Sequence, residues 1–182
     1  SAASDVYKRQ PHNRKGLFSE FTNTLEKKTK DEIIGTFYLP YRKALESFIR
    51  DELERGETLL HMSIHSFTPV FKGKERNCHI GILYDPSRAE DLPAARCLKD
   101  LIAVRLPGLG LRMNYPYTGK SDGFVPYLRK KNAHEFYIGL EMEINQQLPL
   151  EGGERWQKIK NELAGAFFDM LKESKKMQSG SF

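Results

Sequence analysis

The sequence predicts an α/β protein in which helices cover a β-sheet, and three features of the chain support this fold class. Segments with the apolar spacing of helices alternate with segments that have the period of strands. The length of 182 residues, with 39% hydrophobic and 29% charged side chains, suits one globular domain with its own core. No internal repeat or low-complexity linker interrupts the chain, so the elements are expected to build one layered sheet.

Three segments are typical of amphipathic helices, namely residues 39–56, the later part of 87–106, and 154–173. Pro40 suits the first turn of the first helix, and Gly56 is expected to end it. The expected apolar faces are Tyr41, Leu45, Phe48, Ile49 and Leu53 in the first helix, and Trp156, Ile159, Leu163, Phe167 and Met170 in the last.

Three segments are typical of strands. Residues 58–65 alternate, with Leu60, Met62 and Ile64 on one side and His61, Ser63 and His65 on the other. Residues 79–85 form a short β-rich run that ends at Asp85-Pro86. Residues 135–146 alternate most clearly, and their two predicted faces are Phe136, Ile138, Leu140, Met142 and Ile144 against Tyr137, Gly139, Glu141, Glu143 and Asn145.

The two ends of the chain are polar and lack helix or strand periodicity. Residues 1–11 are interpreted as a non-native or disordered leader, and residues 176–182 as a tail. Residues 12–175 are then expected to form a single domain. Only two cysteines occur, without a CxxC motif, which favours a reducing compartment such as the cytoplasm.

The distribution of charged and apolar residues argues against nucleic acid and against a membrane as partners. The net charge of +5 is modest, and the basic residues are scattered beside acidic ones, so nucleic acid is not an expected partner. The apolar runs are far too short to cross a membrane.

Two histidines, His61 and His65, lie four residues apart in the first predicted strand. In a strand this spacing separates them by about 13 Å, at roughly 3.3 Å per residue, so one zinc ion cannot bind both. Ligands in open α/β sheets collect at the carboxyl ends of strands, which favours His65 over His61. The alternative is that His65 is an ordinary polar residue at the end of a strand.

Glu141 and Glu143 share one face of the last predicted strand, among apolar neighbours. A carboxylate that loses its water is usually paired, bound to a metal or protonated. A carboxylate beside a metal ligand is suited to take a proton from a metal-bound water. The alternative is a structural glutamate that accepts hydrogen bonds from a loop.

Four stretches together resemble the N-formylglutamate amidohydrolase family, whose members are similar to the zinc carboxypeptidases. They are HNRKGLFSEFTNTLE, HMSIHSFTPVFKGKERNCHIGILYDPSR, MNYPYTGKSDGF and LEMEINQ, between about His12 and Gln147. The resemblance implies a three-layer α/β/α fold with a central mixed sheet, of the zinc-exopeptidase-like (phosphorylase/hydrolase-like) type. It also implies a zinc-dependent hydrolase that cleaves the amide of an N-acyl amino acid such as N-formyl-glutamate.

The same resemblance assigns roles to individual residues. It implies that His65 is a zinc ligand, that Glu143 is the general base, and that Asn13 and Arg14 bind the substrate's carboxylate. A guanidinium suits that last role, because its planar fork grips a carboxylate through two hydrogen bonds.

Three further residues are candidates for contacts with the substrate. Tyr115 and Tyr117 lie in a loop expected to close over it, and Arg76 is a candidate for binding a second carboxylate. For the tyrosines the alternative is plain packing, and for the arginine it is an ordinary position facing solvent.

One departure from the family pattern concerns the metal. The family's first zinc ligands, a His and a Glu, precede the Asn-Arg pair, and residues 1–11 supply neither. We therefore expect the chain to lack the family's leading strand, to bind zinc substoichiometrically and to be weakly active or inactive by itself. The alternative functions are a carboxypeptidase-like or other amidase on the same scaffold, and a non-catalytic binding module.

Overall fold

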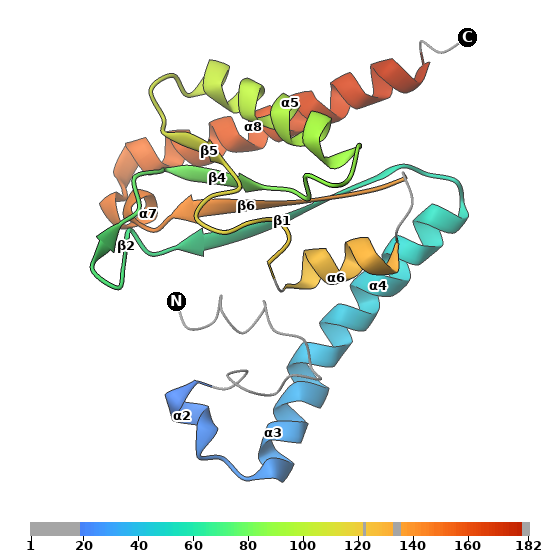
Figure 1. Ribbon diagram of the computed structural model, residues 1–182, viewed down its shortest axis with the longest axis vertical. Coiled ribbons are helices and arrows are strands. Elements are labelled where there is room, and N and C mark those ends of the chain that lie inside the picture. Colours follow the sequence, from blue (N-terminus) through green and yellow to red (C-terminus); the bar gives the residue numbers. More distant parts are fainter. Residues whose placement is uncertain (1–18, 122, 133–135, 180–182) are drawn as a thin grey trace. The chain divides into compact units, whose positions relative to one another are not determined.

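The computed structural model describes residues 19–121, 123–132 and 136–179. Four strands form the central sheet, in the order β1-β6-β4-β5, and Figure 1 shows their arrangement. The strands are β1 (Leu59–Phe67), β4 (Ile80–Leu83), β5 (Leu111–Met113) and β6 (Tyr137–Asn145). Strand β4 is parallel to β5 and antiparallel to β6, so the sheet is mixed.

The chain forms two compact units, Ser1–His61 with Ser121–Gly139, and Met62–Lys120 with Leu140–Phe182. Strands β1 and β6 contribute residues to both. The helices of the first unit are α2 (Glu20–Asn23), α3 (Lys27–Ile33), α4 (Leu39–Glu54) and α6 (Phe124–Lys131), and a π-helical turn, η1 (Ile34–Tyr38), joins α3 to α4.

The first predicted helix is confirmed, but helical structure starts earlier than its proline indicates. Helix α4 has Pro40 in its first turn and is followed by Gly56, whose φ is +81°. The chain upstream is already helical, and the N–H of Leu39 bonds to the carbonyl of Ile34. Because Pro40 has no N–H, it cannot continue an α-helical ladder, and the wider π turn lies where that ladder is interrupted.

The predicted apolar face of α4 is only partly correct. Ile49 is buried and packs with Leu128, but Tyr41 and Phe48 are 53% and 56% exposed. Arg42 is buried in their place, with its guanidinium carbon 3.8 Å from the centre of the Phe124 ring. A guanidinium is weakly hydrated and stacks on aromatic rings, so the helix can turn an arginine toward α6.

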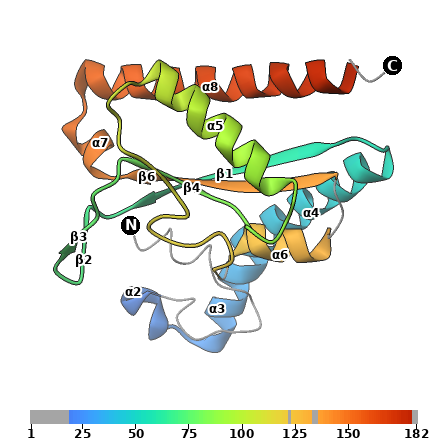
Figure 2. The same cartoon turned by 45° about the horizontal axis from the view of Figure 1, so that its top comes forward.

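The second unit contains two long helices, α5 (Asp91–Arg105) and α8 (Gly153–Ser179), which lie side by side in Figures 1 and 2. Arg105 of α5 bonds to Glu162 at 2.8 Å and to Asp169 at 2.5 Å, both in α8. Gly165 makes room for it, since a Cβ there would lie 2.7 Å from the Arg105 guanidinium. The buried hydrophobic residues of β4 and of these two helices are Ile80, Ile82, Leu83, Ala95, Leu98, Ile102, Ile159, Leu163, Ala166 and Met170.

The short helices and strands of this unit were not predicted from the sequence. They are the hairpin of β2 (Val70–Phe71) and β3 (Lys74–Glu75), strand β5, and helix α7 (Gln147–Glu151). None is long enough to show a periodicity of its own. The predicted fold class is nevertheless confirmed, because the central sheet is mixed and helix α5 packs against its strands β4 and β5.

Along the part of the chain that the structure describes, no helix is long and apolar enough to cross a membrane. The predicted leader at residues 1–11 lies outside the described residues, and α8 is helical as far as Ser179.

Candidate functional site

The pairing of β1 with β6 brings His65 level with Glu143. The N–H of Gln146 bonds to the carbonyl of Phe67, and the N–H of Leu59 bonds to the carbonyl of Phe136. Both bonds fit one parallel register, in which Phe67 lies level with Asn145 and His65 therefore with Glu143. Side chains that lie level on neighbouring strands share a face of the sheet, so these two project together near the carboxyl ends of their strands.

His65 also contacts the other glutamate of that face. Its Nε2 lies 2.9 Å from Ser63 Oγ and 3.7 Å from Glu141 Oε2. Glu141 is 5% exposed and Glu143 is 0% exposed. The predicted desolvation of both carboxylates is confirmed, because both side chains are buried. The contact between His65 and Glu141 is one that the sequence did not reveal.

The row of level residues continues across the sheet. Glu143 lies level with Gly81 of β4, and Gly81 lies level with Arg112 of β5. A Cβ on Gly81 would stand 1.7 Å from the carbonyl oxygen of Tyr115, and 3.5 Å from the Cβ of Glu143. Because Gly81 has no side chain, the backbone of Tyr115 packs directly on the sheet beside Glu143.

The turn that contains Tyr115 is anchored by the residue before it. Asn114 adopts a φ of 50°, and its N–H donates to the carbonyl of Ile82 at 2.8 Å. Its side-chain oxygen accepts bonds from the N–H groups of Tyr84 at 3.1 Å and Gly119 at 2.9 Å. The Tyr115–Pro116 peptide bond is cis. The turn is therefore tied to the end of β4 at both of its ends.

Two of the predicted substrate contacts, Tyr115 and Arg76, contact the ring of Phe67, and the third, Tyr117, contacts Arg76. Tyr115 meets the Phe67 ring edge-on at 6.5 Å between centroids. The guanidinium carbon of Arg76 lies 5.8 Å from the Phe67 ring and 5.2 Å from the Tyr117 ring, and its Nη1 lies 3.4 Å from the Tyr117 hydroxyl. The structure thus brings these three predicted residues together.

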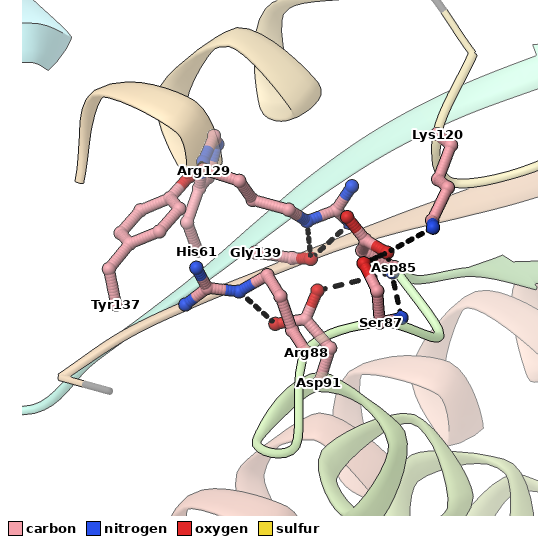
Figure 3. A network of polar contacts seen from close by, with 9 residues as sticks. All are labelled: His61, Asp85, Ser87, Arg88, Asp91, Lys120, Arg129, Tyr137 and Gly139. Carbon is pink, nitrogen blue, oxygen red and sulfur yellow. Dashed lines mark hydrogen bonds and ion pairs between the residues drawn. The ribbon is translucent and has the colours of Figure 1, made fainter. Parts of the chain in front are cut away.

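The remaining predicted residues have other surroundings. His61 bonds through Nδ1 to the Tyr137 hydroxyl at 2.8 Å (Figure 3). Asn13 and Arg14 lie outside the described residues. Asn145, which was not singled out, is buried and donates to the carbonyl of Cys78 at 2.9 Å, so it holds the chain that follows the β2–β3 hairpin.

A second polar cluster belongs to the connection between β4 and α5. Asp85 accepts from Ser87 Oγ at 2.6 Å and lies 3.5 Å from Lys120, and buried Asp91 pairs with Arg88 (Figure 3). Since β4 runs antiparallel to β6, this connection lies at the opposite end of the sheet from Asn145. The contact with Lys120 joins this connection to the segment that follows the Tyr115–Tyr117 turn.

The candidate metal ligand among these side chains is His65. Among the residues that the structure describes, no group of three or more His, Cys, Asp or Glu side chains is arranged to hold a metal. His65 has the suitable ligand type and lies beside two buried carboxylates.

Neither cysteine is suited to be a nucleophile. Burial raises the pKa of the Cys78 thiol. Burial, together with the neighbouring Glu173 carboxylate, raises the pKa of Cys97 to about 11 from a usual 9.0. The thiolate is the reactive form, so both groups are held in their inert state at neutral pH.

This difference in pKa predicts slow alkylation of the folded protein. At pH 8, Cys97 should have about 100-fold less thiolate than an ordinary thiol, because each pKa unit changes that fraction tenfold. We expect iodoacetamide to label both cysteines slowly in native buffer and quickly in denaturant, as followed by mass spectrometry. Native labelling of Cys97 at the rate of free cysteine would contradict this account.

The fold and the cluster define an α/β protein with a histidine and two buried carboxylates near the ends of neighbouring strands. The chain belongs to the N-formylglutamate amidohydrolase family, because the model of that family matches residues 2–149. The family is one of hydrolases that act on amide bonds. The resemblance that the sequence motifs indicated is therefore confirmed.

Two solved structures have a similar fold. The gene product Atu2144 from Agrobacterium tumefaciens is 24% identical, with a TM-score of 0.62, over 97% of this chain and 68% of that chain. An N-formylglutamate amidohydrolase from Ralstonia eutropha JMP134 is 18% identical, with a TM-score of 0.58, over 82% of this chain and 56% of that chain. This chain thus covers little more than half of the length of the Ralstonia eutropha protein. Comparison with curated proteins gives no match.

Proposed function

We propose that the protein is a zinc-dependent amidohydrolase that cleaves the amide bond of an N-acyl amino acid such as N-formyl-glutamate. The observation that carries this proposal is the register of β1 and β6, which places His65 level with the fully buried Glu143. Membership of the amidohydrolase family supports it independently. The two free cysteines fit a reducing compartment, which we take to be the cytoplasm.

In this proposal His65 is one ligand of the metal. Bound zinc would supply the polarisation of the acyl carbonyl and of a water molecule, which is its usual contribution to amide hydrolysis. The remaining ligands are expected outside the described residues, as are Asn13 and Arg14, the proposed partners of the substrate's α-carboxylate.

Glu143 is proposed to move the protons. Its carboxylate takes a proton from water as the oxygen bonds to the acyl carbon, and it returns that proton to the nitrogen as the C–N bond breaks. The products are the free acid and the amine, and Glu143 ends in its starting state. Complete burial favours this role, because a desolvated carboxylate is a stronger proton acceptor than a hydrated one.

A comparison of the two histidines tests the metal ligand. In the full-length protein, His65→Ala should lose bound zinc, because each ligand of a catalytic zinc contributes directly to its affinity. His61→Ala is the matched control, since His61 lies on the same strand and bonds to Tyr137 instead. The number of zinc ions per protein is measured by mass spectrometry after dialysis against metal-free buffer, which removes unbound zinc.

Full zinc content in His65→Ala would contradict the assignment, and so would an equal loss in both variants. Circular dichroism of both variants should match the parent, since a change of fold would remove zinc for another reason.

A further inference from the structure

One ring nitrogen of His65 is held by a serine and a glutamate that lie level with each other. The Nε2 atom lies 2.9 Å from Ser63 Oγ and 3.7 Å from Glu141 Oε2. In the register of β1 and β6 that places His65 level with Glu143, Ser63 is level with Glu141. The ring of His65 therefore turns back along its strand, toward the row of residues that precedes its own.

These contacts are shielded from water. The side chain of His65 is 15% exposed, and that of Glu141 is 6% exposed. On the β4 side, the residue level with Glu141 is Leu83, which is buried and has no polar side-chain atom. Because electrostatic interactions are stronger where water is excluded, the Glu141 carboxylate acts strongly on the ring nitrogen that faces it.

The chemistry of Ser63 and Glu141 decides which nitrogen of His65 carries the proton. A carboxylate accepts hydrogen bonds and donates none, so it favours an N–H rather than a lone pair on the nitrogen that faces it. With the proton on Nε2, Ser63 Oγ accepts it at 2.9 Å, and the charge of Glu141 lies next to the N–H group. A neutral imidazole carries one proton, so the lone pair that a metal requires is then on the other nitrogen.

We propose that Ser63 and Glu141 are positioning residues for His65, which hold its ring by the Nε2–H group and leave the other nitrogen for the metal. The inference rests on the proposed amidohydrolase function, because it concerns the metal ligand of that site. A partner on the far nitrogen of a ligand histidine fixes the tautomer and the orientation of the ring, and removing such a partner typically lowers metal affinity by about 10- to 100-fold.

Zinc affinity of the full-length protein, measured by competition with a chelator, tests the two residues. Ser63→Ala and Glu141→Leu should each weaken zinc binding by about 10- to 100-fold. Glu141→Gln should weaken it by less than about tenfold, because the amide oxygen still accepts a hydrogen bond. Ser66→Ala is the control on the same strand and should leave the affinity unchanged, since Ser66 Oγ lies 3.2 Å from Gln146 Nε2 instead.

Nitrogen-15 NMR of the metal-free, histidine-labelled protein gives a second readout, which does not depend on activity. At mildly alkaline pH the neutral His65 ring should carry its proton on Nε2, and this proton should exchange slowly with water because Ser63 accepts it. Ser63→Ala should lose the slow exchange, and Ser66→Ala should keep it. The signal of His65 is identified by its absence from the spectrum of His65→Ala.

A proton on Nδ1 of His65 in the parent protein would overturn the inference, and so would unchanged zinc affinity in both Ser63→Ala and Glu141→Leu. A loss in only one of these variants would refute the part assigned to the other residue. If Glu141→Gln lost zinc as completely as His65→Ala, Glu141 would be a ligand and not a positioning residue. If the parent protein bound no zinc, the proposed reaction would fail, and the position of the proton on His65 would still decide the inference.

Discussion

Replacing Glu143 with glutamine should lower kcat by about 10²–10⁴-fold, the usual contribution of a general base. Glutamine has the size of glutamate but cannot accept the proton of the attacking water. Zinc content should stay near that of the parent, because Glu143 is proposed to act on protons and His65 to bind the metal. Steady-state hydrolysis of N-formyl-glutamate by the full-length protein and zinc analysis of the same samples measure the two effects.

Glu141→Gln is the matched control, since Glu141 lies on the same strand face and is also buried. Its side chain lies 3.7 Å from His65 Nε2, so a modest loss of zinc affinity is expected, with a smaller effect on kcat. If Glu141→Gln abolished turnover while Glu143→Gln did not, the role of base would move two residues along β6. If neither substitution mattered, a general-base mechanism on this strand would be wrong.

Replacing Gly81 with alanine should disrupt the site without removing any of its functional side chains. The new methyl group would lie 1.7 Å from the Tyr115 carbonyl oxygen, so the Tyr115–Tyr117 turn must move away from the sheet. Overpacking of this kind typically costs about 1–3 kcal/mol, which lowers Tm by roughly 2–12 °C for a chain of this size. Activity should fall further than stability, because the Tyr115 contacts with Phe67 and Arg112 are lost together.

Gly35→Ala is the control for this prediction. Gly35 lies in the helical stretch before α4, and a Cβ there would meet nothing within 4 Å. Alanine favours helix over glycine by up to about 1 kcal/mol, so its Tm should stay equal or rise slightly. Calorimetric melting and kcat/KM for N-formyl-glutamate are the measurements. A Gly81→Ala protein with unchanged Tm and activity would show that the turn does not depend on the close approach at Gly81.

The strands that carry the site were predictable because their signal is local. In residues 135–146 the alternation of side chains placed Glu141 and Glu143 on one face, and β6 has them there, both buried. The choice of a strand for residues 59–65 likewise separated His61 from His65, and the two have different partners in the structure. A period of two residues is imposed by the backbone itself, so it can be read without knowing the neighbours.

Which side chains of a helix are buried was less predictable, because this depends on the elements against which the helix packs. Apolar spacing favoured Tyr41 and Phe48 as inward residues of α4, yet the inward position belongs to Arg42. The reason is the ring of Phe124 on α6, more than 80 residues later in the chain, which offers a stacking surface to the guanidinium. No local pattern in residues 39–56 contains that information.

The sequence by itself determined the fold class, the family and the residue types of the site, because periodicity and motif depend on short stretches of chain. Only the tertiary structure decided which residues stand together. Pairing of β1 with β6, of β6 with β4 and of β4 with β5 aligned His65, Glu143, Gly81 and Arg112 in one row. That alignment is set by hydrogen bonds between segments far apart in sequence, and a slip of one residue would turn each side chain to the other face. The positions of Gly81 and Arg112 against the turn at Tyr115 could therefore be found only in the tertiary structure.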